Sequence, residues 1–378
     1  MDAFLKTDAL VWSAFVILLG LMVGSFINVL VARLPLEKSI FWPGSRCFTC
    51  YQPIAWTDNL PILGYLRLGG KCRSCGAGFS SRYLWVEIGT ALAFFALFAI
   101  EVIHPIHKFP AAKPIATGFP PLGFVAVFLY HAFLMSALIA AALIDAEHRI
   151  IPPIIPYFGA IVGIVGGALM AWPWPLPPGA GAAAIPVGQA WQLPEWHWKI
   201  PLGVQPWPFY GPPPSWAIAG GWKLGLLSSL IGALAGTLVV RWVKWLFEVG
   251  FGKEALGLGD ADLLLMAGAF LGWQPVITAL FLGAFAALFI FKLPSVILGA
   301  IRGAPLEREL PFGPGLAVGV MIALLGWRWI GPRAQFVFFD LQTLCIMVAV
   351  MSVGMLAAGL LLRRGEEAPA APEPVART

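Results

Sequence analysis

Residues 11–32 read VWSAFVILLGLMVGSFINVLVA, an apolar run of 22 residues without a charged side chain. A helix needs about 20 mostly apolar residues to cross the hydrocarbon core of a bilayer. The run therefore predicts a membrane-spanning helix. It is long for a signal peptide and lacks a small-residue cleavage site, so we expect it to be retained.

The composition of the whole chain extends this interpretation. Of its 378 residues, 59% are hydrophobic and 11% are charged, whereas soluble domains carry about 25% charged residues. A soluble core cannot bury so much apolar surface beneath so few charges. This excludes a soluble enzyme and a disordered chain. Five cysteines in a chain of this length also argue against a small disulfide scaffold.

Further apolar runs predict further spans. One run, Leu263–Trp273, is short for a span. The others fit a membrane helix and are Trp85–Ile103, Gly123–Ile144, Tyr157–Trp172, Trp222–Trp242, Val276–Ala300, Gly313–Trp327 and Leu341–Leu362. The sequence therefore predicts eight or nine transmembrane helices. With nine crossings and the N-terminus outside, the inner segments collect sixteen of the 24 Lys and Arg residues, as the positive-inside rule requires.

The chain divides into six segments. The residues of 172–222 include eight of the 17 tryptophans and twelve of the 33 prolines, a composition that opposes helix and favours the membrane interface. We expect an extracytoplasmic insert lying along the membrane surface, and a partner-binding role stays open. The other segments are a first transmembrane helix (1–32), a cysteine-bearing loop (33–84), helices carrying a first carboxylate (85–171), further helices (223–362) and a disordered tail (363–378).

The cysteine-bearing loop predicts a metal site. Cys47-Phe-Thr-Cys50 and Cys72-Arg-Ser-Cys75 are two C-x-x-C pairs separated by 21 residues. Four thiolates complete the tetrahedral shell that Zn²⁺ prefers and leave no position for water, which indicates a structural site. Two disulfides or a redox pair are the alternatives, and a reducing, inward-facing location opposes both. The lone Cys345 is expected to be a packing residue.

The same loop explains the charge of the chain. Between residues 33 and 82 there are seven Lys or Arg and two Asp or Glu, a surplus of +5 that equals the net charge of the whole chain. A basic loop on a membrane protein is usually an orientation signal. We therefore expect membrane lipids, and no nucleic acid, as partners. The fold class expected is an all-α polytopic membrane protein with a small cytoplasmic zinc-binding loop domain.

Two acidic residues lie at the edges of apolar segments, where carboxylates are costly and usually functional. Asp145 ends the span Gly123–Ile144, and Asp260 precedes the short apolar run after Gly257-Leu-Gly259. The two glycines give the backbone freedom to approach a substrate closely. Taken singly, Asp145 could be a helix-end residue at the headgroups and Asp260 an N-cap.

Taken together, Asp145 and Asp260 predict acid–base chemistry. Two carboxylates that meet at a half-dry boundary cannot both ionise, so the pair titrates as a unit. The ionised member can take a proton from water while the protonated member polarises a scissile carbonyl, as aspartic proteolysis requires. A non-enzymatic membrane scaffold is one alternative. An ion-coupled transporter using Lys292 is another, but the chain lacks the internal symmetry that such transporters show.

The ordered motifs resemble the bacterial prepilin peptidases, which are membrane aspartic proteases. The resemblance covers nearly the whole chain and includes Gly24–Val29, Arg33–Pro35, the two C-x-x-C pairs, Trp56–Pro61, Ser81–Tyr83 with Glu87, Asp145 with Pro152, Gly257–Asp260 and Pro311–Pro314. It implies that Asp145 and Asp260 are the catalytic pair. It also places Asn28, Arg33 and Glu87 where the family keeps polar groups at the membrane boundary; span-end anchoring is the alternative to a direct role.

The resemblance further implies the substrate and the location. The family cleaves the basic leader of type IV prepilins or type II secretion pseudopilins at the inner face of the bacterial cytoplasmic membrane. Many members also methylate the new N-terminus with S-adenosylmethionine, and those members carry the cysteine tetrad found here, although no cofactor-binding signature is visible in this chain. The chain departs from the family's pattern at Asp262, where a lysine is usual, at Pro153, where an acidic residue is usual, and in its larger insert.

Overall fold

The computed structural model describes residues 8–103, 122–170, 216, 221–252, 256–302, 312–339 and 341–366. All regular elements in these ranges are helices. Two isolated β-bridges, Arg46–Pro53 and Lys71–Gly78, also occur, both within residues 34–81. The predicted all-α membrane fold is therefore confirmed. Nearly all of the Trp/Pro-rich insert 172–222, and the tail after Glu366, lie outside the described residues.

The helices are α1 (Asp8–Arg33), α2 (Leu63–Leu68), α3 (Arg82–Phe98), α4 (Leu122–His148), α5 (Ile154–Met170), α7 (Trp222–Phe251), α8 (Leu258–Leu271), α9 (Trp273–Ala286), α10 (Leu293–Arg302), α11 (Phe312–Phe339) and α12 (Leu341–Glu366). Among the described residues, six segments are long and apolar enough to cross a membrane: Asp8–Leu36, Arg82–Ile103, Gly123–His148, Trp222–Phe251, Trp273–Ile297 and Gln342–Arg363. Ile154–Met170 and Phe312–Trp327 are shorter apolar helices. The total of eight or nine crossings stays a prediction.

Several helix ends differ from those expected. The predicted span Val276–Ala300 consists of α9 and α10 joined by a π-helical turn, Ala287–Lys292, just before Pro294. A proline cannot donate the backbone hydrogen bond that a regular helix needs, so the ladder is rearranged there. Helix α7 continues past the expected Trp242 to Phe251, and the next residue, Gly252, caps the helix with a left-handed φ of 66°.

The helices approach one another through glycines. A Cβ atom on Gly232 of α7 would overlap the carbonyl oxygen of Gly268 in α8, and one on Gly236 would overlap that of Leu264. These paired contacts show that α7 and α8 run antiparallel. Small residues at helix interfaces are how membrane proteins gain packing contacts, because lipid removes the hydrophobic drive for association.

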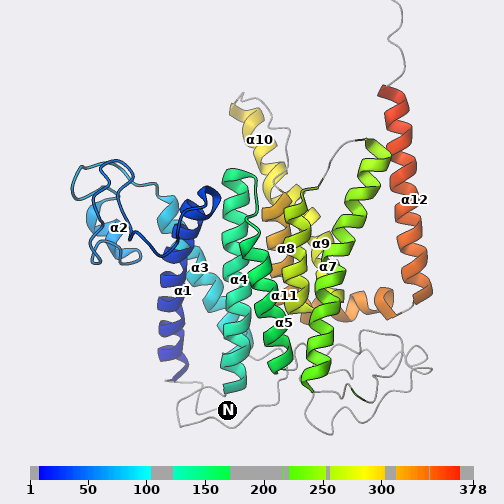
Figure 1. Ribbon diagram of the computed structural model, residues 1–378, viewed down its shortest axis with the longest axis horizontal. Helices are drawn as coiled ribbons and strands as arrows, with labels where there is room; N and C mark the ends of the chain where they lie inside the picture. Colours follow the sequence, from blue (N-terminus) through cyan, green and yellow to red (C-terminus); the bar gives the residue numbers. More distant parts are fainter. Residues whose placement is uncertain are drawn as a thin grey trace, which may run out of the picture.

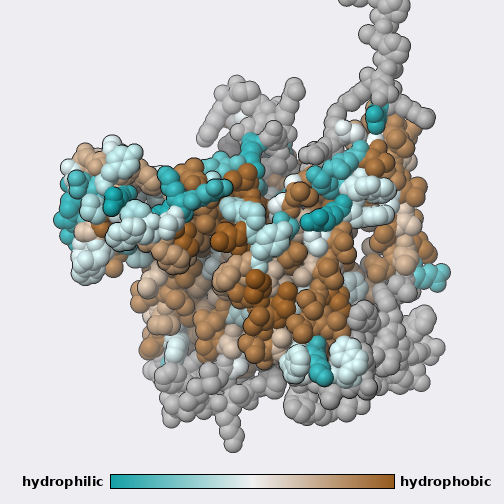
Figure 2. Space-filling model, viewed as in Figure 1, coloured by the Kyte–Doolittle hydropathy of each residue, from teal (hydrophilic) through white to brown (hydrophobic). Residues whose placement is uncertain are grey.

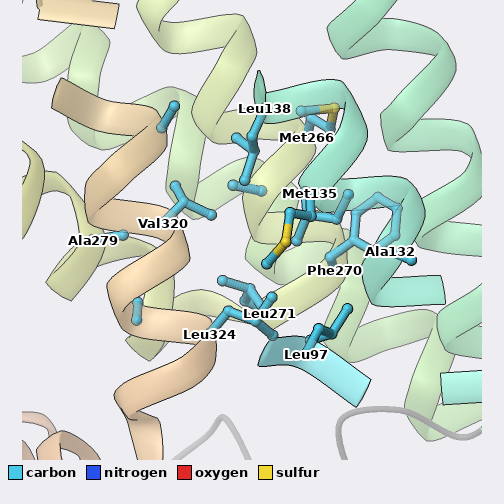
Figure 3. Close-up of a cluster of buried hydrophobic side chains, with 14 of the residues drawn as sticks. Leu97, Ala132, Met135, Leu138, Met266, Phe270, Leu271, Ala279, Val320 and Leu324 are labelled. Carbon is cyan, nitrogen blue, oxygen red and sulfur yellow. The ribbon is translucent and has the colours of Figure 1, made fainter. Parts of the chain in front are cut away.

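The packed interior surrounds α4. Figure 3 shows how its side chains meet those of α3, α8, α9 and α11, including Leu97, Met135, Leu138, Phe270, Val320 and Leu324. In contrast, α12 stands at the edge of the bundle, where Trp242 of α7 donates a hydrogen bond to Ser352 at 3.2 Å. Only 6% of its apolar stretch is buried. The bundle core therefore forms without α12.

One end of the bundle carries the predicted functional groups. Residues 34–81, the C-terminal end of α4 and the N-terminal end of α8 lie at this end, which we call the loop end (Figure 1). Figure 2 shows an apolar band around the helices, with hydrophilic residues gathered near the loop end. The sequence-distant carboxylates are thus brought to one boundary of the apolar band.

Substitution of Gly232 by valine tests the α7–α8 contact. Because the added side chain would overlap the Gly268 carbonyl, the free energy of unfolding should fall by about 1–3 kcal/mol, the usual cost of overpacking. Thermal unfolding in detergent measures the change. Gly354→Ala is the matched control, since nothing lies within 4 Å of its added Cβ. Equal stability of the two variants would contradict the close contact.

Candidate functional site

Asp145 lies in the last turn of α4, three residues before its end at His148. The helix continues past the residue where the expected span ended, so Asp145 belongs to the helix itself. The chain then turns at Arg149, whose φ of 56° is left-handed. This turn directs the following segment, with Ile151, back across the loop end toward α8.

Asp260 is the third residue of α8, and Gly257 is the N-cap. The alternative that Asp260 is itself the N-cap is therefore wrong. Its Oδ2 accepts a hydrogen bond from the Gly257 amide at 3.1 Å, which ties the side chain to the start of its own helix. The N-terminus of a helix favours negative charge, since its free amides point outward. Asp260 is 8% exposed.

The last turn of α4, with Asp145, and the first turn of α8, with Asp260, lie at the same end of the bundle (Figure 1). In addition, Gly259 packs against Ile151 in the segment that follows Asp145. A third helix completes the arrangement: the Gly313 amide at the start of α11 donates a hydrogen bond to Asp145. A Cβ on Gly313 would overlap the Asp145 carboxyl group. The sequence placed Gly313 in the Pro311–Pro314 motif, but nothing in that motif indicated contact with Asp145.

The two glycines before Asp260 have different surroundings. A Cβ on Gly259 would lie 3.1 Å from the Ile151 side chain, so this glycine admits the segment that follows α4. A Cβ on Gly257 would lie 3.6 Å from Asp260 Oδ2, an ordinary contact. The structure thus brings Gly259 against a neighbouring segment of the chain. That Gly257 and Gly259 let the backbone approach a substrate closely stays a prediction.

The additional carboxylate, Asp262, is directed toward α7. Its Oδ1 lies 3.9 Å from the Arg241 guanidinium, so a positive charge on α7 offsets it. Nearby, Lys244 donates a hydrogen bond to the Leu256 carbonyl at 3.2 Å and pairs with Glu248 at 3.1 Å. Arg241 and Lys244 were not identified from the sequence, because their roles depend on how α7 packs against α8.

The four cysteines of the loop form a compact thiol cluster. Their sulfur atoms all lie within 4.8 Å of one another; Cys47 and Cys75 are 3.8 Å apart, and Cys50 and Cys72 are 3.9 Å apart. A tetrahedron with Zn–S bonds of about 2.3 Å has edges of about 3.8 Å. The cluster is therefore close to the geometry of a four-thiolate zinc site and could hold the ion. All five cysteines of the chain are free thiols.

Two similar turns build the thiol cluster. The amide of Tyr51 donates to the Cys47 carbonyl, and the amide of Gly76 donates to the Cys72 carbonyl, each at 2.9 Å. Both turns need a left-handed residue after the second cysteine, with φ of 59° at Tyr51 and 72° at Gly76. Only the second turn has glycine, which adopts this conformation without steric cost.

The thiols have unequal acidities. Hydrogen bonds from the backbone amides of Cys50 and Thr49 lower the pKa of Cys47 to about 6. Although the Ala77 amide favours its thiolate, burial and the other three thiols raise the pKa of Cys75 to about 12. One thiolate thus opposes the formation of the others. A bound cation would remove this opposition, since metal ligands must be deprotonated.

The loop is attached to the bundle by polar contacts. Glu87 of α3 accepts a hydrogen bond from the Ile62 amide at 2.7 Å, and Asn28 of α1 donates to the Tyr83 carbonyl at 3.1 Å. Arg82, at the start of α3, forms an ion pair with Glu147, two residues after Asp145. These contacts support the anchoring role for Asn28 and Glu87. Glu87 ties the loop to α3, and Arg82 ties the start of α3, where the loop ends, to the end of α4.

Arg73, between the two cysteines of the second C-x-x-C pair, is bound to a carboxylate of the loop. It forms a two-pronged pair with Asp58, with Nε–Oδ2 and Nη2–Oδ1 distances of 2.7 and 2.5 Å. Arg33 also bonds within the loop, to the carbonyls of Ser39 and Gly44 at 3.0 and 3.3 Å. These arginines therefore shape the loop.

Metal analysis of the purified protein tests the thiol cluster. We expect close to one zinc ion per chain and, for Cys72→Ser, a large loss of zinc, because three thiolates leave the shell incomplete. Cys345→Ser is the matched control and should retain the metal, since Cys345 lies on α12 outside the cluster. Zinc-free protein prepared without chelator would contradict the assignment.

Two family models match the chain. The Bacterial Peptidase A24 N-terminal domain matches residues 18–100, which include the four clustered cysteines. The Type IV leader peptidase family matches residues 214–291, which include Gly257, Gly259 and Asp260. Asp145 lies between the two matched segments. No solved structure matches the chain.

Curated relatives extend the match across most of the chain. A prepilin leader peptidase/N-methyltransferase of Klebsiella pneumoniae is 31% identical over 282 residues, covering 73% of this chain and 92% of the relative. One of Myxococcus xanthus is 30% identical, covering 71% and 59%, and one of Pseudomonas aeruginosa is 28% identical, covering 85% and 93%. By this similarity, the chain belongs to the type IV leader peptidase family.

Proposed function

We propose that this protein is a membrane aspartic endopeptidase that removes the leader peptide of type IV prepilins or type II secretion pseudopilins. The observation that carries the proposal is that the last turn of α4, with Asp145, and the first turn of α8, with Asp260, lie at the same end of the bundle, although the two helices are far apart in the sequence. Curated relatives named prepilin leader peptidase/N-methyltransferase support the same activity. The loop end would face the cytoplasm of a bacterial inner membrane.

The proposed chemistry needs one proton shared by two carboxyl groups. The ionised carboxylate takes a proton from water, and the water oxygen attacks the scissile carbonyl. The protonated carboxyl group donates a hydrogen bond to that carbonyl oxygen as negative charge develops on it. The amides of Gly257 and Gly313 hold Asp260 and Asp145 in place during these transfers.

The position of the pair suits a substrate that is itself partly in the membrane. A prepilin has a basic leader followed by an apolar helix, so its cleavage site would lie at the boundary between lipid and cytosol. The C-terminal end of α4 and the N-terminal end of α8, which carry Asp145 and Asp260, lie at the loop end (Figure 1), where hydrophilic residues border the apolar band (Figure 2). A substrate helix docked laterally against the bundle would hold its scissile bond near the pair.

Methylation of the new N-terminus is proposed as a second activity, supported by the names of the relatives. S-adenosylmethionine would supply the methyl group, and we assign no residues to its binding. Zinc is proposed as a structural ion held by Cys47, Cys50, Cys72 and Cys75. The four thiols would fill its coordination shell, so the ion would stabilise the loop.

Replacement of Asp145 or Asp260 by asparagine tests the catalytic pair. Each variant should lose cleavage of a coexpressed prepilin reporter by a factor of about 10²–10⁴, because an amide cannot act as a general acid–base catalyst. Mass spectrometry of the reporter measures loss of the leader and any single methyl group added to the cleaved product.

Asp262→Asn is the matched control, because this carboxylate faces Arg241 rather than Asp145. It should retain far more activity than Asp260→Asn. Full cleavage by the Asp145→Asn or Asp260→Asn protein would defeat the protease assignment and favour a non-enzymatic scaffold.

A methyl group at residue 313 tests the geometry around Asp145. Gly313→Ala should lower cleavage strongly, because the added Cβ overlaps the Asp145 carboxyl group and displaces it. Reporter cleavage and thermal unfolding in detergent are measured together, with Gly354→Ala as the control. Unchanged cleavage by a folded Gly313→Ala protein would contradict the contact.

A further inference from the structure

Seven large apolar side chains are strongly exposed on the loop that carries the four clustered cysteines, residues 34–81, which is here called the zinc loop. We call them the loop patch, and each is between 63% and 84% exposed: Phe41, Trp42, Phe48, Tyr51, Trp56, Leu63 and Leu66. They lie outside the six candidate membrane spans. Exposed apolar groups gathered in one region usually mark a binding surface.

The position of the loop indicates what covers this patch. In Figure 1 the loop lies beside the upper part of α1, level with the ends of the helices, and does not cap the bundle. A membrane that surrounds α1 would therefore extend directly to the loop. Met22 and Phe26 in the C-terminal half of α1, and Trp85 in the first turn of α3, are exposed apolar side chains on the two helices that flank the loop in sequence.

The charge of the loop points to the same partner. Residues 33–82 carry seven basic and two acidic side chains, and one of the acidic ones, Asp58, is paired with Arg73. Exposed basic residues that remain beside the loop patch include Lys38, Arg46 and Arg67. Anionic headgroups attract such residues, while Trp and Tyr settle at the depth of the headgroups.

We propose that the zinc loop is a membrane-surface module that lies in the lipid headgroup layer of the leaflet at the loop end of the bundle. The side chains of the loop patch enter this headgroup layer, and the basic residues of the loop contact anionic headgroups. The combination of aromatic side chains, positive charge and a lateral position favours a lipid surface over a protein partner. This proposal does not depend on the peptidase activity.

The consequence for the bundle follows from the contacts of the loop. Glu87 holds the Ile62 amide at the start of α2, and Arg82 holds Glu147 near the end of α4. A loop resting on lipid would therefore be fixed both to the bilayer and to the helix that carries Asp145. Lipid contact would limit the movement of the loop relative to the bundle.

Photo-crosslinking in proteoliposomes tests the proposal. The photoreactive residue p-benzoylphenylalanine replaces Trp42 or Trp56 in the full chain, and Ser74, an exposed polar residue of the same loop, is the control position. Vesicles contain phosphatidylcholine alone or mixed with phosphatidylglycerol. We expect lipid adducts at positions 42 and 56 to exceed those at 74 several-fold, and to increase with phosphatidylglycerol.

A charge variant separates headgroup binding from apolar contact. In vesicles with phosphatidylglycerol, Arg67→Gln should reduce the lipid adducts at position 42. Lys223→Gln is the control and should leave them unchanged, because Lys223 lies at the N-terminal end of α7, which is at the opposite end of the bundle from the loop end. Zinc content verifies that each variant keeps a folded loop. Because the readout is the lipid adduct, the result is independent of whether a prepilin is cleaved.

Two results would overturn the proposal as a whole, and a third would overturn its assignment of the basic residues to anionic headgroups. Adducts at positions 42 and 56 no more abundant than at 74 would show that the patch is not in lipid. Adducts formed with a prepilin reporter or a second copy of the chain, in place of lipid, would assign the patch to that partner. Lipid adducts that ignore both phosphatidylglycerol and Arg67→Gln would remove the electrostatic part.

Discussion

The structure depends on keeping two carboxyl groups at the edge of lipid, where neither the hydrocarbon nor bulk water surrounds them completely. An unpaired charge in the hydrocarbon is costly, so Asp145 and Asp260 occupy the end turns of their helices. Backbone amides from Gly257 and Gly313 satisfy them there. Those amides are in place only because the C-terminal end of α4 and the N-terminal ends of α8 and α11 lie at the same level of the bundle.

Glycine contacts between the helices set that level. Gly232 and Gly236 fix the register of α7 against α8, and on the other face of α8 Gly163 of α5 meets Phe270. A slide of α8 by one turn would move Asp260 by about 5.4 Å, away from Asp145. Packing deep in the apolar band therefore controls geometry at its edge.

The features that could be predicted from the sequence are those that depend on the spacing of residues close together in the chain. The C-x-x-C pairs and the G-x-G-D stretch carry their meaning within a few residues, so the thiol cluster and the location of Asp260 were accessible. The contact of Gly313 with Asp145, the pair of Arg82 with Glu147 and the pair of Arg241 with Asp262 were not. Each joins different helices, and no local pattern specifies which turns face each other. The end of α4 was misplaced for a related reason: hydropathy falls at Asp145, whereas the helical hydrogen bonds continue to His148.

The two turns of the thiol cluster look alike but are not equal in energy. Tyr51 holds a left-handed backbone that Gly76 adopts freely, and for an L-residue this costs about 1–2 kcal/mol. A bound metal ion would have to offset that cost in the first turn only. If such an ion left, the half with Cys47 and Cys50 would gain more free energy by relaxing than the half with Cys72 and Cys75. We therefore expect a metal-loaded site to open first at the cysteine pair nearer the N-terminus.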